Sequence, residues 1–426
     1  MSKPIQPVRG MNDVLPADAP LWECVESTAA RLFSDYGYRQ IRLPVLERTE
    51  LFSRSIGEAT DIVEKEMYTF EDRNGDQITM RPEATAGVVR AGLSNGLLHN
   101  QQQKLWCSGP MFRHERPQRG RYRQFHQLSV EALGFSEPET DAELIVISAR
   151  LWEALGIESV TLELNSLGTL EARAEYKRAL IDYFSAHRDA LDEDSVRRLE
   201  RNSLRILDSK NDAMRDLISG APLLADYLDE ASRVHFESVK ALLTDVGVDF
   251  DINPRLVRGL DYYSHTVFEW VTDKLGAQSA ICSGGRYNGL IAELGGRDTP
   301  ACGWALGIER VVELMQAEGQ QAAAIVPHLY LVAVGDAARR KGFALAESLR
   351  GRMSGLRVTL DQARSGLKAQ LKRADRTGAR FALILGDDEV AADRVSLKDL
   401  RGDQGQQSLT ESELVVTLTA LLEPLE

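Results

Sequence analysis

A long helical stretch interrupts the strand pattern of this 426-residue chain, and the interruption limits the folds that the chain can adopt. Residues 159–168 alternate apolar and polar side chains as a strand does, and strand character returns at residues 248–272. Residues 169–243 are instead dense in charge and place Leu and Ala at helical spacing. Strands separated in this way can share a sheet only if the helices between them form an inserted subdomain. The sequence therefore predicts one sheet built from strands that are distant in sequence.

Shorter signals indicate the other elements of this first region. Residues 39–47 are typical of one strand, and Pro44, which lacks an N–H donor, assigns it to a sheet edge, a kink or a subunit interface. Residues 52–72 indicate a mobile segment followed by a short strand, and Asn74-Gly75 predicts a tight hairpin turn. The residue spacing also predicts helices at 20–36, 81–93 and 138–156, and a strand–Gly–helix unit at 302–316.

The last hundred residues have a different organisation. After an expected linker at 318–326, four strands alternate with helices at 337–353, 366–378 and 411–423, which predicts a small doubly wound α/β domain. We therefore expect two domains, residues 1–325 with an inserted helical subdomain at about 169–243, and residues 326–426. Helix 366–378 is expected to bury Leu367, Leu371 and Ala374 and to expose Lys368, Lys372, Arg373 and Arg376.

Charge is distributed unevenly along a chain whose formal net charge is −13. Residues 336–380 hold twelve Lys and Arg against four Asp and Glu. This basic island is compatible with RNA binding at specific places, and equally with helices that are simply solvated. A second basic stretch has five Arg within residues 112–123.

Residues 112–134 predict two strands joined by a basic hairpin loop. With a period of two, Leu128, Val130 and Ala132 share the apolar face of the second strand. The opposite face carries Arg121, Arg123, Phe125, Gln127, Ser129 and Glu131. A cationic end, an aromatic ring, an amide and a carboxylate in one row indicate a binding surface. The alternative is a solvated strand beside a charged loop.

Several chemistries lack their sequence signatures. There is no GxxxxGK[ST] phosphate loop, no strand-linked GxGxxG, no GxSxG and no HExxH. The four cysteines form no CxxC pair, which argues against zinc and favours reduced, cytoplasmic thiols. No apolar signal-peptide region and no run of 18 apolar residues occur, so we expect no membrane span.

The remaining candidates are guanidinium groups, which suit a substrate whose phosphates gain charge during reaction. Arg310 falls in the first turn of the helix after Gly307, where an anion is favoured. Glu83 at a helix start suits either an ammonium ligand or the helix dipole. Arg258 and Tyr263 are five residues apart, so a regular strand would direct them to opposite faces unless Gly259 hosts a bulge.

Three segments resemble the signature motifs of the class II aminoacyl-tRNA synthetases: RLPVLERTELF with Pro44, FRHERPQRGRYRQFHQ, and GWALGIERVVEL. RGLDYYSHTVFEW (258–270) and SGGRYNGL (283–290) resemble blocks of the histidyl-tRNA synthetase family, and the resemblance covers essentially the whole chain. It implies an α+β fold in which an antiparallel catalytic sheet of six to seven strands carries a helical insertion. It also implies a C-terminal α/β anticodon-binding domain.

The resemblance further implies roles for individual residues. ATP would be bound by Arg113, Glu115, Arg121, Phe125 and Arg310, with Arg113 at the α-phosphate and the last two at the adenine. Histidine would be bound by Glu83, Thr85, Gln127, Glu131, Tyr262 and Tyr263, with Glu131 and Tyr263 at the imidazole nitrogens. The catalytic set would be Arg258, Arg113 and Gln127. Arg116 and Gln118 would face the tRNA acceptor end, and no residue would hold a metal.

The implied reaction joins L-histidine to tRNA(His) in two steps. The histidine carboxylate attacks the α-phosphate of ATP and pyrophosphate leaves, and the terminal ribose hydroxyl of the tRNA then attacks the adenylate. Mg²⁺ is expected on ATP, without a tightly bound protein cofactor. The resemblance also implies a homodimer in the cytoplasm, with no membrane partner.

Two alternatives have different functions. A non-catalytic paralogue, the regulatory subunit of ATP phosphoribosyltransferase, would share the catalytic fold but lose the ATP residues and the C-terminal domain. An inactive module that binds RNA or senses uncharged tRNA would keep residues 327–426 and relax the pocket. The presence of Arg113, Arg258 and Arg310 argues against both.

Overall fold

The computed structural model describes residues 4–57, 60, 62–201, 203–207, 209, 211–276, 279–321, 325–402 and 405–422. The chain forms two compact units, Met1–Ala322 and Ala323–Glu426. Within the described residues, no helix has the length and apolar character needed to cross a membrane.

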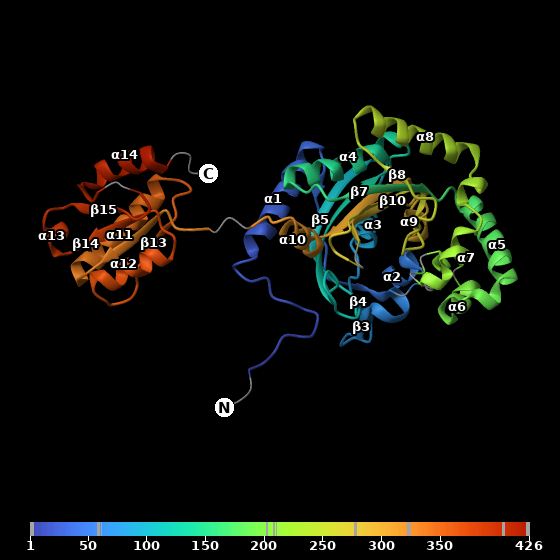
Figure 1. The fold of residues 1–426 in the computed structure, drawn as a ribbon, viewed down its shortest axis with the longest axis horizontal. Coiled ribbons are helices and arrows are strands. Elements are labelled where there is room, and N and C mark those ends of the chain that lie inside the picture. The colour runs from blue at the N-terminus through green and yellow to red at the C-terminus, as the bar shows by residue number, and fades with distance from the viewer. Residues whose placement is uncertain are drawn as a thin grey trace. The chain divides into compact units, whose positions relative to one another are not determined.

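An eight-stranded sheet forms the centre of the first unit (Figure 1). Its order is β1-β5-β6-β11-β10-β9-β7-β8, and the six inner strands pair antiparallel while each short edge strand pairs parallel with its neighbour. These edge strands make the sheet larger than the six to seven strands expected. The strands are β1 Arg39–Gln40, β5 Gln103–Phe112, β6 Gln124–Leu133, β7 Thr161–Ser166, β8 Asp251–Ile252, β9 Ser264–Val271, β10 Ala280–Arg286 and β11 Ala301–Gly307.

The helical insertion lies between β7 and β8, which are neighbours in the sheet although residues 167–250 separate them (Figure 1). It contains α5 Leu170–Ala186, α6 Glu193–Arg201, α7 Arg215–Ser219 and α8 Glu230–Asp245, with short 3₁₀ turns between them. Among its described residues there is no strand, so the expected insertion is confirmed. The sheet is therefore built from strands distant in sequence.

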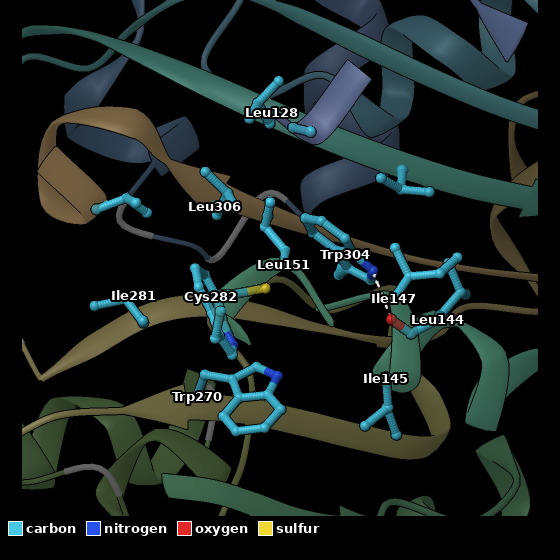
Figure 2. Packing of buried hydrophobic residues seen from close by; sticks show 14 of the residues in the cluster. Leu128, Leu144, Ile145, Ile147, Leu151, Trp270, Ile281, Cys282, Trp304 and Leu306 are labelled. Atoms are coloured by element: carbon cyan, nitrogen blue, oxygen red, sulfur yellow. Dashed lines mark hydrogen bonds between the residues drawn. The ribbon is translucent and has the colours of Figure 1, made fainter. Parts of the chain in front are cut away.

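One face of the sheet is covered by α1 Ala19–Asp35, α4 Pro138–Leu155, α8 and α10 Ile308–Ala317. The predicted apolar face of β6 packs here, and Leu128, Val130 and Ala132 are fully buried. Figure 2 shows Leu144, Ile145, Ile147 and Leu151 of α4 against Trp270, Cys282, Trp304 and Leu306 of three strands. The indole of Trp304 donates a 2.9 Å hydrogen bond to the carbonyl of Leu144 in the same view.

The opposite face is covered by α3 Thr85–Ser94, α5 and α9 Leu290–Glu293. Tyr176, Leu180 and Phe184 of α5 join Val88 and Leu133 in this second core. The insertion thus shares a hydrophobic core with the sheet, because its first helix presents apolar side chains at helical spacing.

One prediction near the N-terminus is wrong. Residues 39–47 do not form one strand, because the chain leaves the large sheet after β1 and enters a small sheet at β2 Leu46–Arg48. Pro44 lies at this break, where no ladder N–H is needed. The segment expected to be mobile contains α2 Thr49–Ile56 and a π-helical turn at Ile62–Glu66, and its mobility stays a prediction. The short strand expected after it is confirmed as β3 Tyr68–Glu71, while residues 58, 59 and 61 lie outside the described part.

The small sheet has the order β2-β4-β3, with β3 Tyr68–Glu71 and β4 Gln77–Met80. The predicted hairpin turn is confirmed, since β3 and β4 pair antiparallel across it. Gly75 has φ +87°, a conformation that glycine adopts without strain.

The predicted strand at 248–272 is also wrong over its middle. Only Asp251–Ile252 and Ser264–Val271 are strands, and residues 253–263 form turns and irregular backbone. Arg258 and Tyr263 therefore do not obey strand alternation, and no bulge at Gly259 is needed to bring them together. The Arg258 guanidinium carbon lies 5.5 Å from the centre of the Tyr263 ring.

The second unit contains a five-stranded sheet of order β13-β12-β14-β15-β16 flanked by helices. The structure contains one strand and one short helix more than the sequence predicted. The elements are β12 Leu329–Ala333, α11 Asp336–Arg352, β13 Val358–Leu360, α12 Leu367–Arg376, β14 Phe381–Leu385, α13 Asp387–Ala391, β15 Val395–Asp399, β16 Gln407–Leu409 and α14 Glu411–Leu422.

The helix α12 differs from expectation in one buried residue. Leu367 is 43% exposed, contrary to expectation, whereas Gln370 and Ala374 are fully buried. The side-chain amide of Gln370 accepts a hydrogen bond from the Ala333 N–H and donates one to the Ala333 carbonyl. These bonds explain why a polar side chain occupies the inner face of the helix.

Candidate active site

A cavity of about 350 Å³ opens on the sheet of the first unit, beside the predicted basic hairpin. Its walls come from β6, β10, β11, the start of α3, the start of α10 and the irregular segment before β9. Eleven of the predicted site residues line it: Glu83, Thr85, Arg113, Glu115, Arg121, Phe125, Gln127, Arg258, Tyr262, Tyr263 and Arg310. The structure thus brings together residues from four separate parts of the chain.

Glu83 and Thr85 form one end of the cavity at the start of α3. The carboxylate of Glu83 accepts hydrogen bonds from the backbone N–H groups of Thr85, at 2.5 Å, and Ala86, at 3.0 Å. Burial raises the pKa of Glu83, and those backbone bonds and Arg113 oppose that rise. Glu83 therefore complements the start of α3 and also lines the cavity, while its role as an ammonium ligand stays a prediction.

Glu131 lies next to this end but is not among the residues that line the cavity. It is 1% exposed. Thr85 donates its hydroxyl hydrogen to Glu131 Oε1 at 2.7 Å, and the Tyr287 hydroxyl donates to Oε2. Burial raises the pKa of Glu131 to about 8, although both hydroxyl donors lower it. Gly303 on β11 makes room for this carboxylate, because a Cβ atom there would lie 1.9 Å from Oε2.

Tyr287 was missed in the sequence analysis, although it lies within the histidine-type block SGGRYNGL. It is fully buried, and its ring packs edge-on against Tyr262, with centroids 5.5 Å apart. Tyr262 and Tyr263 stack at 4.7 Å between centroids. An aromatic wall therefore surrounds the buried acid.

The hairpin end of the cavity is cationic. Arg113 Nε donates to the Pro82 carbonyl at 2.9 Å, and its guanidinium carbon lies 5.2 Å from the centre of the Phe125 ring. Glu115 is buried and forms an ion pair with Arg121. The free part of the Phe125 ring and these guanidinium groups make a surface suited to a base and its phosphates.

Arg310 approaches the same end from the first turn of α10. It donates to the carbonyls of Gly120, at 2.8 Å, and Ala280, at 2.6 Å. Burial lowers the pKa of Arg310, and the neighbouring Arg121 adds to that effect. The convergence of three guanidinium groups in a partly buried site favours a polyanionic ligand.

Arg258 is held between the two ends. Its Nη1 lies 2.6 Å from Glu269 Oε1 on β9, a partner that the sequence analysis missed. The Nε atom of Arg258 and the Oε1 atom of Gln127 are buried without a hydrogen-bond partner among the described residues. Buried polar atoms normally have partners, so these two indicate where a ligand would bond.

The hairpin loop holds the residues expected to face RNA. Arg116 and Gln118 are exposed and do not line the cavity. Gln118 and Arg121 exchange two backbone hydrogen bonds of 3.0 Å, which close a tight turn. Two further Arg of this hairpin bond within the protein: Arg119 donates to Glu313 at 3.2 Å, and Arg123 donates to the Glu115 carbonyl at 3.1 Å.

Comparison with known proteins agrees with this architecture. The family model of histidyl-tRNA synthetase matches residues 10–311, and that of an anticodon binding domain matches residues 328–421. The chain is 56% identical over 421 residues to a histidine–tRNA ligase of Halorhodospira halophila, which covers 99% of both proteins. It is 55% identical to that of Alkalilimnicola ehrlichii, covering 96% of this chain and 95% of the relative.

A solved structure supports the fold. The apo histidyl-tRNA synthetase of S. aureus superposes with a TM-score of 0.81 at 35% identity, covering 97% of this chain and 99% of that one. The antiparallel sheet, its cationic hairpin and the separate anticodon-binding unit define a class II aminoacyl-tRNA synthetase. Within that class, the chain belongs to the histidyl-tRNA synthetase family.

Proposed function

We propose that this chain activates L-histidine with ATP and transfers the histidyl group to the 3′ end of tRNA(His), as an aminoacyl-tRNA ligase. The observation that carries this proposal is the cavity with two chemically different ends. One end has an aromatic wall and a buried acid held by Thr85 and Tyr287. The other has three guanidinium groups, from Arg113, Arg121 and Arg310.

The acid end suits a histidine side chain. We infer that Glu131 and Tyr263 recognise the imidazole nitrogens, and that Tyr262 packs beside the ring. Both Glu131 oxygens already accept a hydrogen bond, but a carboxylate has about four lone-pair sites and can accept a further N–H. An amino acid without that N–H would bury this carboxylate further without supplying the additional bond, which gives selectivity on the order of 10⁴-fold.

The backbone groups of histidine would be held between the two ends. Glu83 and Thr85 bind the α-ammonium group, and the unpartnered Oε1 of Gln127 offers a further acceptor for it. Arg258 stabilises charge on the reacting carboxylate and α-phosphate with its unpartnered Nε. Arg113 binds the same phosphate from the opposite side, which aligns the carboxylate for in-line attack.

The hairpin end would bind ATP. Phe125 and Arg310 clamp the adenine, and Glu115 and Arg121 contact the nucleotide as an ion pair. We infer that Mg²⁺ enters with the phosphates of ATP.

tRNA would contact both units. We infer that Arg116 and Gln118, exposed on the hairpin loop, face the acceptor end of the tRNA. The second unit would bind the anticodon, and the exposed Lys368, Lys372 and Arg376 of α12 are the candidate surface. Arg373 is not part of that surface, because it pairs with Asp361 at 2.8 Å.

A homodimer is proposed from the small β2-β4-β3 sheet. The strand register places Leu46, Phe70, Ile78 and Met80 on one face. Leu46 is 43% and Phe70 45% exposed. The opposite face is polar: Thr79 at its centre is fully buried, whereas Thr69, Glu71 and Gln77 are exposed. An exposed apolar sheet face marks an interaction site, and its place in the first class II motif favours a second copy of the chain.

A cytoplasmic location is also proposed. It is supported by four cysteines that form no disulfide, three of them buried. The regulatory-subunit alternative is not favoured, given 55–56% identity to ligases over nearly the whole chain. Charging of tRNA(His) with labelled histidine tests the proposed function, and absence of charging by the folded full chain would overturn it.

A further inference from the structure

Residues 253–263, here called the pocket loop, carry Arg258, Tyr262 and Tyr263 to the cavity but contain no helix or strand. Strand hydrogen bonds therefore do not fix the backbone of the pocket loop. Its carbonyl and N–H groups must find other partners, since buried backbone groups are rarely left unpaired. Several of these partners come from the helical insertion.

Arg173, near the start of α5, holds the pocket loop from outside the cavity. Its Nη1 donates to the Tyr263 carbonyl at 2.5 Å, and its Nη2 to the Asp261 carbonyl at 2.9 Å. Both bonds come from one planar guanidinium, so the two carbonyls are held at a fixed separation. Burial lowers the pKa of Arg173, with the Asp261 carboxylate opposing that effect.

A second arginine, Arg255, extends from the pocket loop and bonds to the helical insertion. From the pocket loop, it donates to the carbonyls of Pro222 at 2.7 Å, Ala221 at 2.5 Å and Ser219 at 3.0 Å in the insertion. The Tyr176 hydroxyl of α5 donates to the same Pro222 carbonyl at 3.0 Å. The pocket loop and the insertion therefore hold each other at two places.

We propose that Arg173 is a positioning residue for the amino-acid pocket, which sets the affinity for histidine by holding the pocket loop against the helical insertion. The identity of the ligand rests on the proposed function. Arg173 does not line the cavity, so it acts through the backbone that carries Tyr263. A displacement of about 1 Å at a reacting or binding group can cost on the order of 10²-fold in rate. Loss of two backbone bonds is sufficient for such a displacement.

Arg173→Met keeps the stem of the side chain and removes both donors. We expect a histidine KM in ATP–pyrophosphate exchange about tenfold higher, which corresponds to about 1.4 kcal/mol. The KM for ATP should stay within about twofold, because the ATP end depends on Arg113 and Arg310. Arg173→Lys retains one donor at a time and should give an intermediate histidine KM. Arg178→Met is the matched control, because Arg178 is exposed on the same helix and, among the described residues, bonds only to the Ala174 carbonyl of that helix.

Amide hydrogen exchange gives a readout that does not depend on the activity. In Arg173→Met the amides of residues 256–263 should exchange faster than in the wild type, with those of β5 and β6 unchanged. A histidine KM within twofold of wild type in folded Arg173→Met or Arg173→Lys would overturn the proposal. If Arg173→Met does not fold, the lysine variant decides alone. A wild type without histidine-dependent exchange would refute the proposed function, while faster amide exchange in the variant would still support the positioning role.

Discussion

The hydroxyl of Tyr287 donates a hydrogen bond to Glu131, and both side chains are fully buried beside the cavity. This pair joins β10 to β6 across the neighbouring strand β11. Burial raises the pKa of Glu131 to about 8, and the bond from Tyr287 is one of two that hold it lower. The charge of the acid at neutral pH therefore depends on this tyrosine.

Tyr287→Phe removes that bond and should raise the pKa of Glu131 further. The ionised carboxylate is a better acceptor for an imidazole N–H than the protonated acid, so histidine affinity should fall as the pH drops through the pKa of Glu131. In Tyr287→Phe this fall should occur about one pH unit higher than in the wild type. The measurement is the histidine KM as a function of pH. Tyr38→Phe is the control, since Tyr38 is also buried and donates to a glutamate, Glu143, at 3.1 Å away from the cavity. Overlapping profiles for Tyr287→Phe and wild type would contradict the assignment.

The same raised pKa has a consequence for stability. A buried acid whose folded pKa is above its ordinary 4.5 favours the folded state at low pH. Its contribution is fully present below about 4.5 and is lost as pH rises toward about 8. Glu131→Gln should therefore remove a contribution to the free energy of unfolding that decreases between about pH 4.5 and about pH 8. Urea unfolding at several pH values measures this contribution.

Arg258→Ala should lower histidine-dependent ATP–pyrophosphate exchange by about 10²-fold or more, because it removes a cation from the reacting centre. The change also leaves Glu269 without its 2.6 Å partner. Sedimentation should show the same oligomeric state as for the wild type, which separates lost catalysis from lost folding. Near-normal exchange would exclude the proposed role of Arg258.

Arg286→Met tests a buried ion pair. Arg286 bonds to Asp141 from β10, and both side chains are at most 3% exposed. Removal of Arg286 leaves the buried Asp141 carboxylate with only the His235 imidazole, 3.3 Å away, as an ion-pair partner among the described residues. The free energy of unfolding measured in urea should therefore fall by about 3–5 kcal/mol. Arg150→Met removes an exposed pair with Glu153 and should change stability by less than about 1 kcal/mol. Equal effects of the two variants would contradict the burial argument.

Arg116→Ala separates the two steps of the reaction. Arg116 is exposed and lies outside the cavity, so pyrophosphate exchange should be unchanged within about twofold. The KM for tRNA should rise several-fold, with a weaker dependence on salt, because one phosphate contact is lost. An equal loss in exchange would place Arg116 at the ATP site instead.

The sequence predicted the parts of the site that regular elements position. The period of two along β6 placed Phe125 and Gln127 on the face that lines the cavity, and Leu128 on the face that is buried. The helical insertion was predicted for a similar reason, because helical spacing is visible over long stretches.

Contacts between distant segments were not predictable in the same way. Tyr287 acts on Glu131 across 156 positions, and no local pattern reports such a pair. The pocket loop lies between two segments of strand character, yet side-chain bonds made by Arg173 and Arg255 hold it in an irregular form. Tertiary bonds here override strand propensity.

The most direct test of the central claim is ATP–pyrophosphate exchange by the full chain, measured with each of the twenty amino acids in turn. The account predicts exchange with L-histidine, and at least about 10⁴-fold lower efficiency with any other amino acid, because only imidazole satisfies the Glu131 and Tyr263 site. Comparable exchange with several amino acids, or none with histidine, would contradict it.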